Sequence, residues 1–290
     1  SYETSRGPLK WAIQAVIRRS CRCAHRVITI CHELRQTCQD DRLCDIDKVR
    51  VILAGSSNGI DLKRFTLTDS LRDSALKLRQ QAGVPENAVV VGMVARLMIE
   101  KGVCELIEAF RKLESRWPDL WLLFVGPFEA LHHPLPPEIQ TLIRTHPRIW
   151  YAGFQKETER YYAAMDVFAL PSYREGFGSV IIEASALERP VITSDIMGCR
   201  EACADGESGL LVSPRNAAAL TEAVERLLAD PDLRERLGRQ GRRRVEEKFD
   251  QQKYWPAMDA VFRELLQARS CPLPEKRDRG AAAEVAGVEN

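Results

Sequence analysis

The sequence predicts an α/β protein built on a doubly wound parallel sheet. Short apolar strands alternate with amphipathic helices from about residue 66 onward, and several of these strands are continuous apolar runs. Such runs are typical of parallel strands whose two faces are both covered by helices. The 290 residues are 45% apolar and 29% charged, which is the composition of an ordinary globular protein with a substantial core.

The predicted strands of the regular part are residues 89–95, 120–125, 148–151, 167–170 and 191–193. Helices are expected before the first of these strands, between them and after the last one. The helix that follows the strand at 89–95 carries an i, i+3, i+4, i+7 apolar stripe from Val103 to Phe110 that would pack on a sheet. The expected helices are residues 68–82, the segment around 103–110, 138–144, 157–164, 178–187, 216–229, 231–247 and 254–267. Strands joined in this way form right-handed βαβ units.

The first 62 residues are interpreted as a partial α/β domain and a linker. Helices are expected at 9–22 and 33–40 and strands at 26–30 and 49–53, followed by the polar linker 55–59. Two strands are too few for a self-sufficient sheet. The sequence also begins at Ser1 without a Met, so a longer reading frame is expected.

The remaining boundaries follow from the same pattern. We expect one domain over residues 63–250, a helix over 251–267 that packs back on the N-terminal part, and a disordered tail over 268–290.

The charge balance excludes an electrostatic argument for nucleic acid, because 42 Lys and Arg oppose 41 Asp and Glu. No apolar run reaches the roughly 18 residues of a membrane helix and no signal peptide is visible, so a cytoplasmic location is expected. The basic face of residues 9–22 could touch an anionic inner-membrane surface or be an ordinary packed helix. Likewise, residues 239–244 could bind an anion or form a solvated helix face.

Five of the nine cysteines, with His25 and His32, lie in the first 44 residues. A zinc site is one interpretation and small buried thiols are the other. The spacings contain no Cys-x2-Cys pair, which favours buried thiols.

The first candidate site lies directly after the strand at 89–95. Arg96 and Lys101 bracket a strand-to-helix loop, where a planar guanidinium, a mobile ammonium and a helix N-terminus would suit a diphosphate. A pair of exposed surface cations is the alternative. The segment has neither a Gly-x-Gly-x-x-Gly nor a Gly-Lys-Ser/Thr loop, which argues against a nicotinamide site and a P-loop.

The second candidate site follows the strand at 167–170. Gly176 and Gly178 would let the backbone approach a ligand, and the helix that follows would offer free N–H groups to phosphate oxygens. Glu175 before that helix and Glu183 inside it could accept sugar hydroxyls. Alternatively, Glu175 caps the helix and Glu183 lies on the surface.

A third, weaker candidate is Gly153-Phe154-Gln155, just past the strand at 148–151. It could form one wall of a nucleobase site or be a plain turn.

These residues resemble a known family. Arg96-x4-Lys101-Gly102, followed by Glu175-Gly-Phe-Gly and Glu183 in Glu-x7-Glu spacing, is similar to the retaining family-4 glycosyltransferases of the GT-B fold. Further similar pieces occur in family order at residues 58–61, 164–172, 190–195 and 206–212. Within the family, residues 57–61, 125–129 and 173–177 look most like bacterial capsule, O-antigen and exopolysaccharide transferases.

The resemblance implies a role for each matching residue. Arg96 and Lys101 would hold the donor diphosphate and stabilise the charge on the leaving group. Glu175 would bind hydroxyls of the transferred sugar, Glu183 the ribose, and Gln155 and its neighbours the base. The remaining donor-binding residues would be Gly176, Phe177, Gly178, Ser179 and Val180. No metal or other cofactor is implied, and the isolated Asp45-x-Asp47 is not interpreted as a metal site.

The implied activity is transfer of a sugar from a nucleotide-diphosphate donor to a polyprenyl-linked or glycan acceptor, with retention, in cell-surface polysaccharide synthesis. A UDP-linked hexose or N-acetylhexosamine is the expected donor. Relatives carry an N-terminal domain that supplies a Gly-rich loop and a His, and only its last two strands are recognisable here. This chain alone is therefore expected to bind the donor but transfer little. The alternative is an inactive nucleotide-sugar-binding module, left by truncation or completed by a partner chain.

Overall fold

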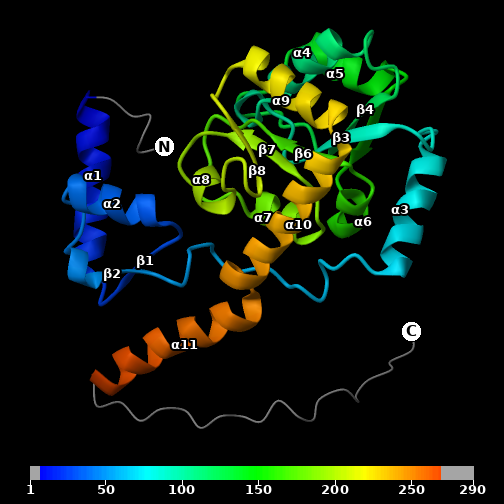
Figure 1. Cartoon of the computed structure of the whole chain (residues 1–290). Helices are drawn as coiled ribbons and strands as arrows, with labels where there is room; N and C mark the ends of the chain where they lie inside the picture. The colour runs from blue at the N-terminus through cyan, green and yellow to red at the C-terminus, as the bar shows by residue number, and fades with distance from the viewer. Residues whose placement is uncertain (1–6, 269–290) are drawn as a thin grey trace, which may run out of the picture.

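The computed structural model describes residues 7–268, which form two parallel α/β units (Figure 1). The larger unit contains a six-stranded sheet of order β5-β4-β3-β6-β7-β8, in which every neighbouring pair is parallel. Its strands are β3 (Val89–Val94), β4 (Leu120–Val125), β5 (Ile149–Gly153), β6 (Val167–Leu170), β7 (Val191–Ser194) and β8 (Gly209–Val212). The predicted fold class is confirmed.

The strand order reverses beside β3. From β3 the chain moves outward to β4 and β5, then returns to place β6 on the other side of β3. Loops that follow β3 and β6 therefore diverge from a topological switch point, the position at which open α/β sheets bind their ligands.

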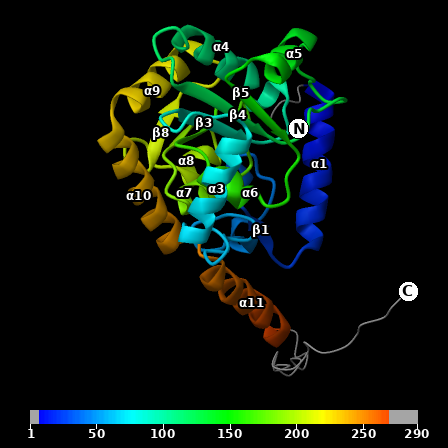
Figure 2. The ribbon, with the colours of Figure 1, turned by 90° about the vertical axis from the view of Figure 1, so that its right-hand side faces the viewer.

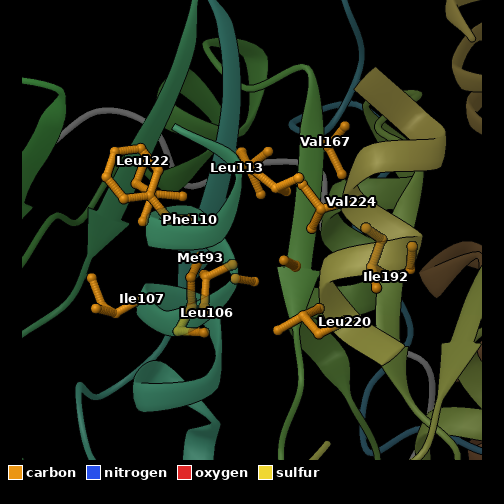
Figure 3. Close-up of a cluster of buried hydrophobic side chains, with 14 of the residues drawn as sticks. Met93, Leu106, Ile107, Phe110, Leu113, Leu122, Val167, Ile192, Leu220 and Val224 are labelled. Atoms are coloured by element: carbon orange, nitrogen blue, oxygen red, sulfur yellow. The ribbon is translucent and has the colours of Figure 1, made fainter. Parts of the chain in front are cut away.

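Helices cover both faces of this sheet because successive strand residues face opposite ways. They are α3 (Asp69–Gln81), α4 (Val103–Leu113), α5 (Pro137–Thr145), α6 (Thr158–Ala163), α7 (Ser179–Ala186), α8 (Cys199–Ala202), α9 (Ala217–Ala229) and α10 (Pro231–Lys248). On one face, Met93 packs with Leu106 and Phe110 of α4 and Val224 of α9 (Figure 3). On the other, Val90 and Val94 pack with residues of α6, α7 and α10.

The sheet has one strand more than the sequence interpretation allowed. The core was expected to end with the strand at 191–193, but β8 pairs with β7 beyond it, and the short helix α8 lies between them. A Cβ on Gly209 would lie 2.4 Å from the Val191 carbonyl oxygen. Glycine therefore permits the close pairing, although its weak strand propensity hides β8 in the sequence.

The smaller unit consists of α1 (Gly7–Cys23), β1 (Val27–Thr29), α2 (His32–Asp40), the 3-10 turn η2 (Ile46–Lys48) and β2 (Val49–Val51). Strands β1 and β2 pair in parallel. Its core includes Cys38, Leu43 and Val49, with Ile17 of α1 packed against them. Cys31 and Cys38 are buried, and residues 7–268 contain no group of three or more His, Cys, Asp or Glu side chains that could hold a metal ion.

The last described helix, α11 (Gln251–Ala268), extends beyond the larger unit (Figure 2). The Ile60 N–H donates to the Phe249 carbonyl at 2.7 Å, and the Gln251 N–H donates to the Ile60 carbonyl at 3.0 Å. Farther along, Glu264 pairs with Arg26 of the smaller unit at 2.6 Å. The tail expected over 268–290 lies outside the described residues, apart from Ala268.

Across residues 7–268, no helix combines the length and the apolarity needed to cross a membrane.

Candidate functional site

Arg96 stands where the pairing of β3 and β4 continues past the two strands. Leu97 and Phe128 form an isolated parallel bridge, and the Leu97 N–H donates to the Pro127 carbonyl at 2.8 Å. This register places the Arg96 guanidinium 2.6 Å from Glu129, with 59% of the Arg96 side chain exposed. Two backbone N–H groups, of Leu131 and His132, also bind the Glu129 carboxylate. The Leu131 N–H is the main reason that the pKa of Glu129 is lowered.

Lys101 reaches the loop after β6. Its ammonium lies 2.5 Å from Glu175 Oε1, and the Ser172 hydroxyl donates to the same oxygen at 2.9 Å. Only 21% of the Lys101 side chain and 14% of the Glu175 side chain are exposed. The structure therefore brings these two residues of the predicted site together, from segments 74 positions apart.

Gly102 allows this contact because it lets the two loops meet. Its φ is +74°, and a Cβ there would lie 2.2 Å from the Pro171 carbonyl oxygen. Beside it, Glu100 accepts two bonds from Arg174, at 2.6 and 2.7 Å. The Arg174 guanidinium lowers the pKa of Glu100. Two ion pairs thus bridge the loops at the switch point.

The start of α7 supplies the glycine loop expected after β6. Gly176 is exposed, whereas Phe177 and Gly178 are buried. Ser179 and Val180 open the helix, and both are half-buried. The Ser179 N–H already donates to the Phe177 carbonyl at 2.8 Å, so it is not available to a phosphate in this arrangement.

Glu183 lies four residues into α7 and contacts α6. It accepts a hydrogen bond from the Tyr162 hydroxyl at 2.8 Å. Burial raises the pKa of Glu183, and burial also raises the pKa of Tyr162. The sequence interpretation missed Tyr162, because nothing in the spacing of α6 marks its hydroxyl as functional.

This environment leads to a pH-dependent prediction. The pKa of Glu183 is higher in the folded protein than its ordinary value of 4.5, which applies to the unfolded chain. The ionised carboxylate therefore destabilises the fold most at a pH above the folded-state pKa. The destabilisation vanishes below pH 4.5, where the group is protonated in both states. Glu183→Gln keeps an oxygen that can accept from Tyr162. We expect a higher melting temperature than wild type at pH 7.5 and a difference that shrinks toward pH 4.5. The exposed Glu222→Gln on α9 is the control. A Glu183→Gln advantage that grew with acidity would contradict the assignment.

Gln155 lies apart from the Lys101–Glu175 pair. It follows the edge strand β5, which is three strand spacings, roughly 14 Å, from β6. Its amide donates to the Ala152 carbonyl at 2.7 Å, and the neighbouring Phe154 ring is 68% exposed.

The sequence interpretation also missed the loop after β7. Gly198 has a φ of +77°, and a Cβ there would lie 2.6 Å from the Gly176 carbonyl oxygen, so this loop supports the glycine loop. Arg200 of α8 binds Asp195 at 2.9 Å and Glu33 of the smaller unit at 2.8 Å. Burial raises the pKa of the neighbouring Cys199 thiol to about 12, which keeps it protonated at neutral pH.

The smaller unit faces this same edge of the sheet (Figure 1). Ile30, just after β1, has its Cδ1 atom 3.0 Å from the position of a Cβ on Gly176. The Glu33 N–H donates to the Glu201 carboxylate at 3.0 Å. The carboxyl end of β1 and the carboxyl ends of β6 and β7 therefore point toward one another.

A family model supplies the deciding comparison. The model described as "Glycosyl transferases group 1" matches residues 74–244, more than half of the chain. The chain belongs to this family. The matched span contains the loops after β3, β6 and β7 described above.

Among curated relatives, the capsular polysaccharide biosynthesis glycosyltransferase CapM of Staphylococcus aureus is 32% identical over 84% of this chain and 63% of CapM. The chain thus spans about half to two thirds of the length of the first curated relatives it matches. A glycosyltransferase structure from Rickettsia africae superimposes with a TM-score of 0.74 at 25% identity, over 83% of this chain and 64% of that one.

The Anabaena HepE structure with UDP and glucose superimposes with a TM-score of 0.71 at 23% identity, over 87% of this chain and 67% of that one. At this identity the likeness shows the shared GT-B fold.

Proposed function

We propose that this chain carries the donor-binding domain of a transferase that moves a sugar from a nucleoside-diphosphate donor to an acceptor with retention. The observation that carries the proposal is the Lys101–Glu175 pair, which joins the loops on either side of the switch point. A cation for a diphosphate and a carboxylate for sugar hydroxyls stand side by side there.

In this proposal Lys101 exchanges part of its contact with Glu175 for the donor diphosphate. Arg96 pairs with Glu129 and is largely exposed, so its planar fork can turn to a second phosphate. Both cations would stabilise the charge that builds on the departing nucleotide, without a metal. Glu175, released from Lys101, would accept hydroxyls of the transferred sugar, and Glu183 would accept those of the ribose.

We assign the donor as UDP linked to a hexose or an N-acetylhexosamine and the acceptor as a polyprenyl-linked or glycan chain in cell-surface polysaccharide synthesis. The support is the capsular polysaccharide role in the name of CapM and the UDP in the HepE structure. We further assign a place on the cytoplasmic side of a membrane, with peripheral contact. Leu9, Trp11 and Val16 of α1 are all more than 60% exposed, which supplies an apolar surface for it.

Calorimetric titration tests the donor assignment. UDP and UDP-sugars should bind, and GDP and its sugar conjugates should bind more weakly. Retained anomeric configuration in the product of a transfer assay with a polyprenyl-phosphate-linked acceptor would support the reaction. No binding of any nucleoside diphosphate would refute the proposal. Donor binding with little transfer is the result expected of this chain alone, and transfer as fast as that of a full-length relative would contradict that expectation.

A further inference from the structure

A basic cavity lies in the smaller unit, away from the donor site. It has a volume of about 390 Å³ and is formed by the end of α1, the end of α2 and the segment leading into η2. Its lining contains four cations, Arg18, Arg22, Arg42 and Lys48, against one carboxylate, Asp45. Since α1 precedes β1 and η2 precedes β2, the cavity lies at the amino edge of the two-stranded sheet, opposite the edge that faces Gly176.

Two of these cations are held in place by backbone oxygens. Arg18 donates to the carbonyls of Arg42 at 3.1 Å and Asp41 at 3.0 Å, and Lys48 donates to those of Arg22 at 3.3 Å and Ala24 at 3.2 Å. Such bonds position the charges without neutralising them. A purely structural role, in which both side chains cap helix ends, accounts for Arg18 and Lys48 but not for the other two.

Arg22 and Arg42 are exposed, and Asp45 is the one carboxylate among the residues that line the cavity. Arg42 also holds a φ of +48° just past the end of α2, a left-handed position where glycine or asparagine is normally favoured. An arginine therefore occupies a strained position at the rim of a cation-lined cavity.

Other basic cavities of the molecule differ. Two of them share Arg189 and Asp166, and the Asp166 carboxylate pairs with Arg79 at 2.6 Å. A third has two carboxylates, Glu207 and Glu247, beside its three cations.

We propose that the amino-edge cavity binds a phosphate group or a diphosphate. A phosphate monoester carries about −1.5 to −2 charge at pH 7, so one or two such groups balance the excess of cations. Guanidinium forks from Arg22 and Arg42 can each take two phosphate oxygens, while Arg18 and Lys48 supply fixed positive charge. The ligand is either a free phosphate compound or the headgroup of an anionic lipid.

Cys21 and Cys44 also line the cavity and provide a local readout that the donor site cannot affect. The rate of their alkylation would be mapped by mass spectrometry with the exposed Cys23 as internal reference. Inorganic pyrophosphate should slow alkylation of Cys21 and Cys44, and saturating UDP should leave this protection unchanged. The double variant Arg22→Gln/Arg42→Gln should weaken pyrophosphate binding to the cavity by roughly two orders of magnitude in Kd, because two charge-assisted contacts are lost.

Arg19→Gln/Arg35→Gln is the matched control, because it removes the same charge from arginines outside the cavity lining. Protection by pyrophosphate identifies a free phosphate ligand. Protection only by phosphatidylglycerol-containing vesicles, and not by pure phosphatidylcholine vesicles, identifies a lipid headgroup. Three results would contradict the proposed site. In the first, neither pyrophosphate nor phosphatidylglycerol vesicles protect the two cysteines, and in the second, phosphatidylcholine alone protects them equally well. The third is protection that is unchanged in Arg22→Gln/Arg42→Gln. Failure of UDP binding would count against the donor site alone.

Discussion

Lys101→Ala is expected to weaken nucleoside-diphosphate binding by roughly 10- to 150-fold. The ammonium is the better-buried of the two cations at the switch point, and a lost charge-assisted hydrogen bond costs about 1.5–3 kcal/mol. The substitution also leaves Glu175, 14% exposed, without its cation. Its carboxylate would then repel the donor phosphates as well. Calorimetric titration with UDP measures the change in Kd.

Lys112→Ala is the matched control for this substitution. Lys112 is a lysine of the following helix that pairs with Glu108 and is 48% exposed, so its removal should leave UDP affinity unchanged. Equal affinity of Lys101→Ala and wild type for UDP would remove Lys101 from the donor site, whatever the effect on transfer.

Gly102→Ala is expected to lower stability by about 2–5 kcal/mol and the melting temperature by roughly 5–15 °C. Two effects combine. An alanine is strained at a φ of +74°, and its Cβ would lie 2.2 Å from the Pro171 carbonyl oxygen, so the loops after β3 and β6 would have to separate. Separation would also pull Lys101 from Glu175, and UDP affinity should fall with stability.

Gly83→Ala isolates the steric part of this prediction. Gly83 has nearly the same φ, +72°, but a Cβ there would have nothing within 4 Å. Backbone strain alone predicts a loss of about 1 kcal/mol and unchanged UDP binding. If thermal melts showed equal losses for the two variants, the close approach of the loops at Gly102 would not matter.

The sheet could be predicted largely because its strands are buried on both faces. Continuous runs such as residues 89–94 and 120–125 have no other simple explanation, and the predicted strand 167–170 coincides with β6. Strand β8 escaped because it is four residues long and begins with the glycine that its close pairing requires. A strand is hard to predict from local sequence where a contact with a distant segment requires a residue, such as this glycine, that strands normally avoid.

The site was predictable to the level of loops but not of partners. Parallel strands end at one edge of a sheet, which is why the loops holding Lys101 and Glu175 could be expected to lie near each other. Spacing alone could not reveal that Arg96 binds Glu129, that Glu183 accepts from Tyr162, or that Arg200 joins α8 to the smaller unit. These pairings depend on side-chain directions that become defined only when the helices are packed.

The pairing of Ile60 with residues 249–251 constrains how the two units can move. The polypeptide passes between the units twice, and the two passages are joined by backbone hydrogen bonds on both sides of Ile60. A Cβ on the adjacent Gly59 would lie 2.8 Å from the Phe249 carbonyl oxygen, so the passages are in close contact. A double tether of this kind resists sliding of the two units past each other. Any relative motion of the units would therefore bend both passages together rather than one alone.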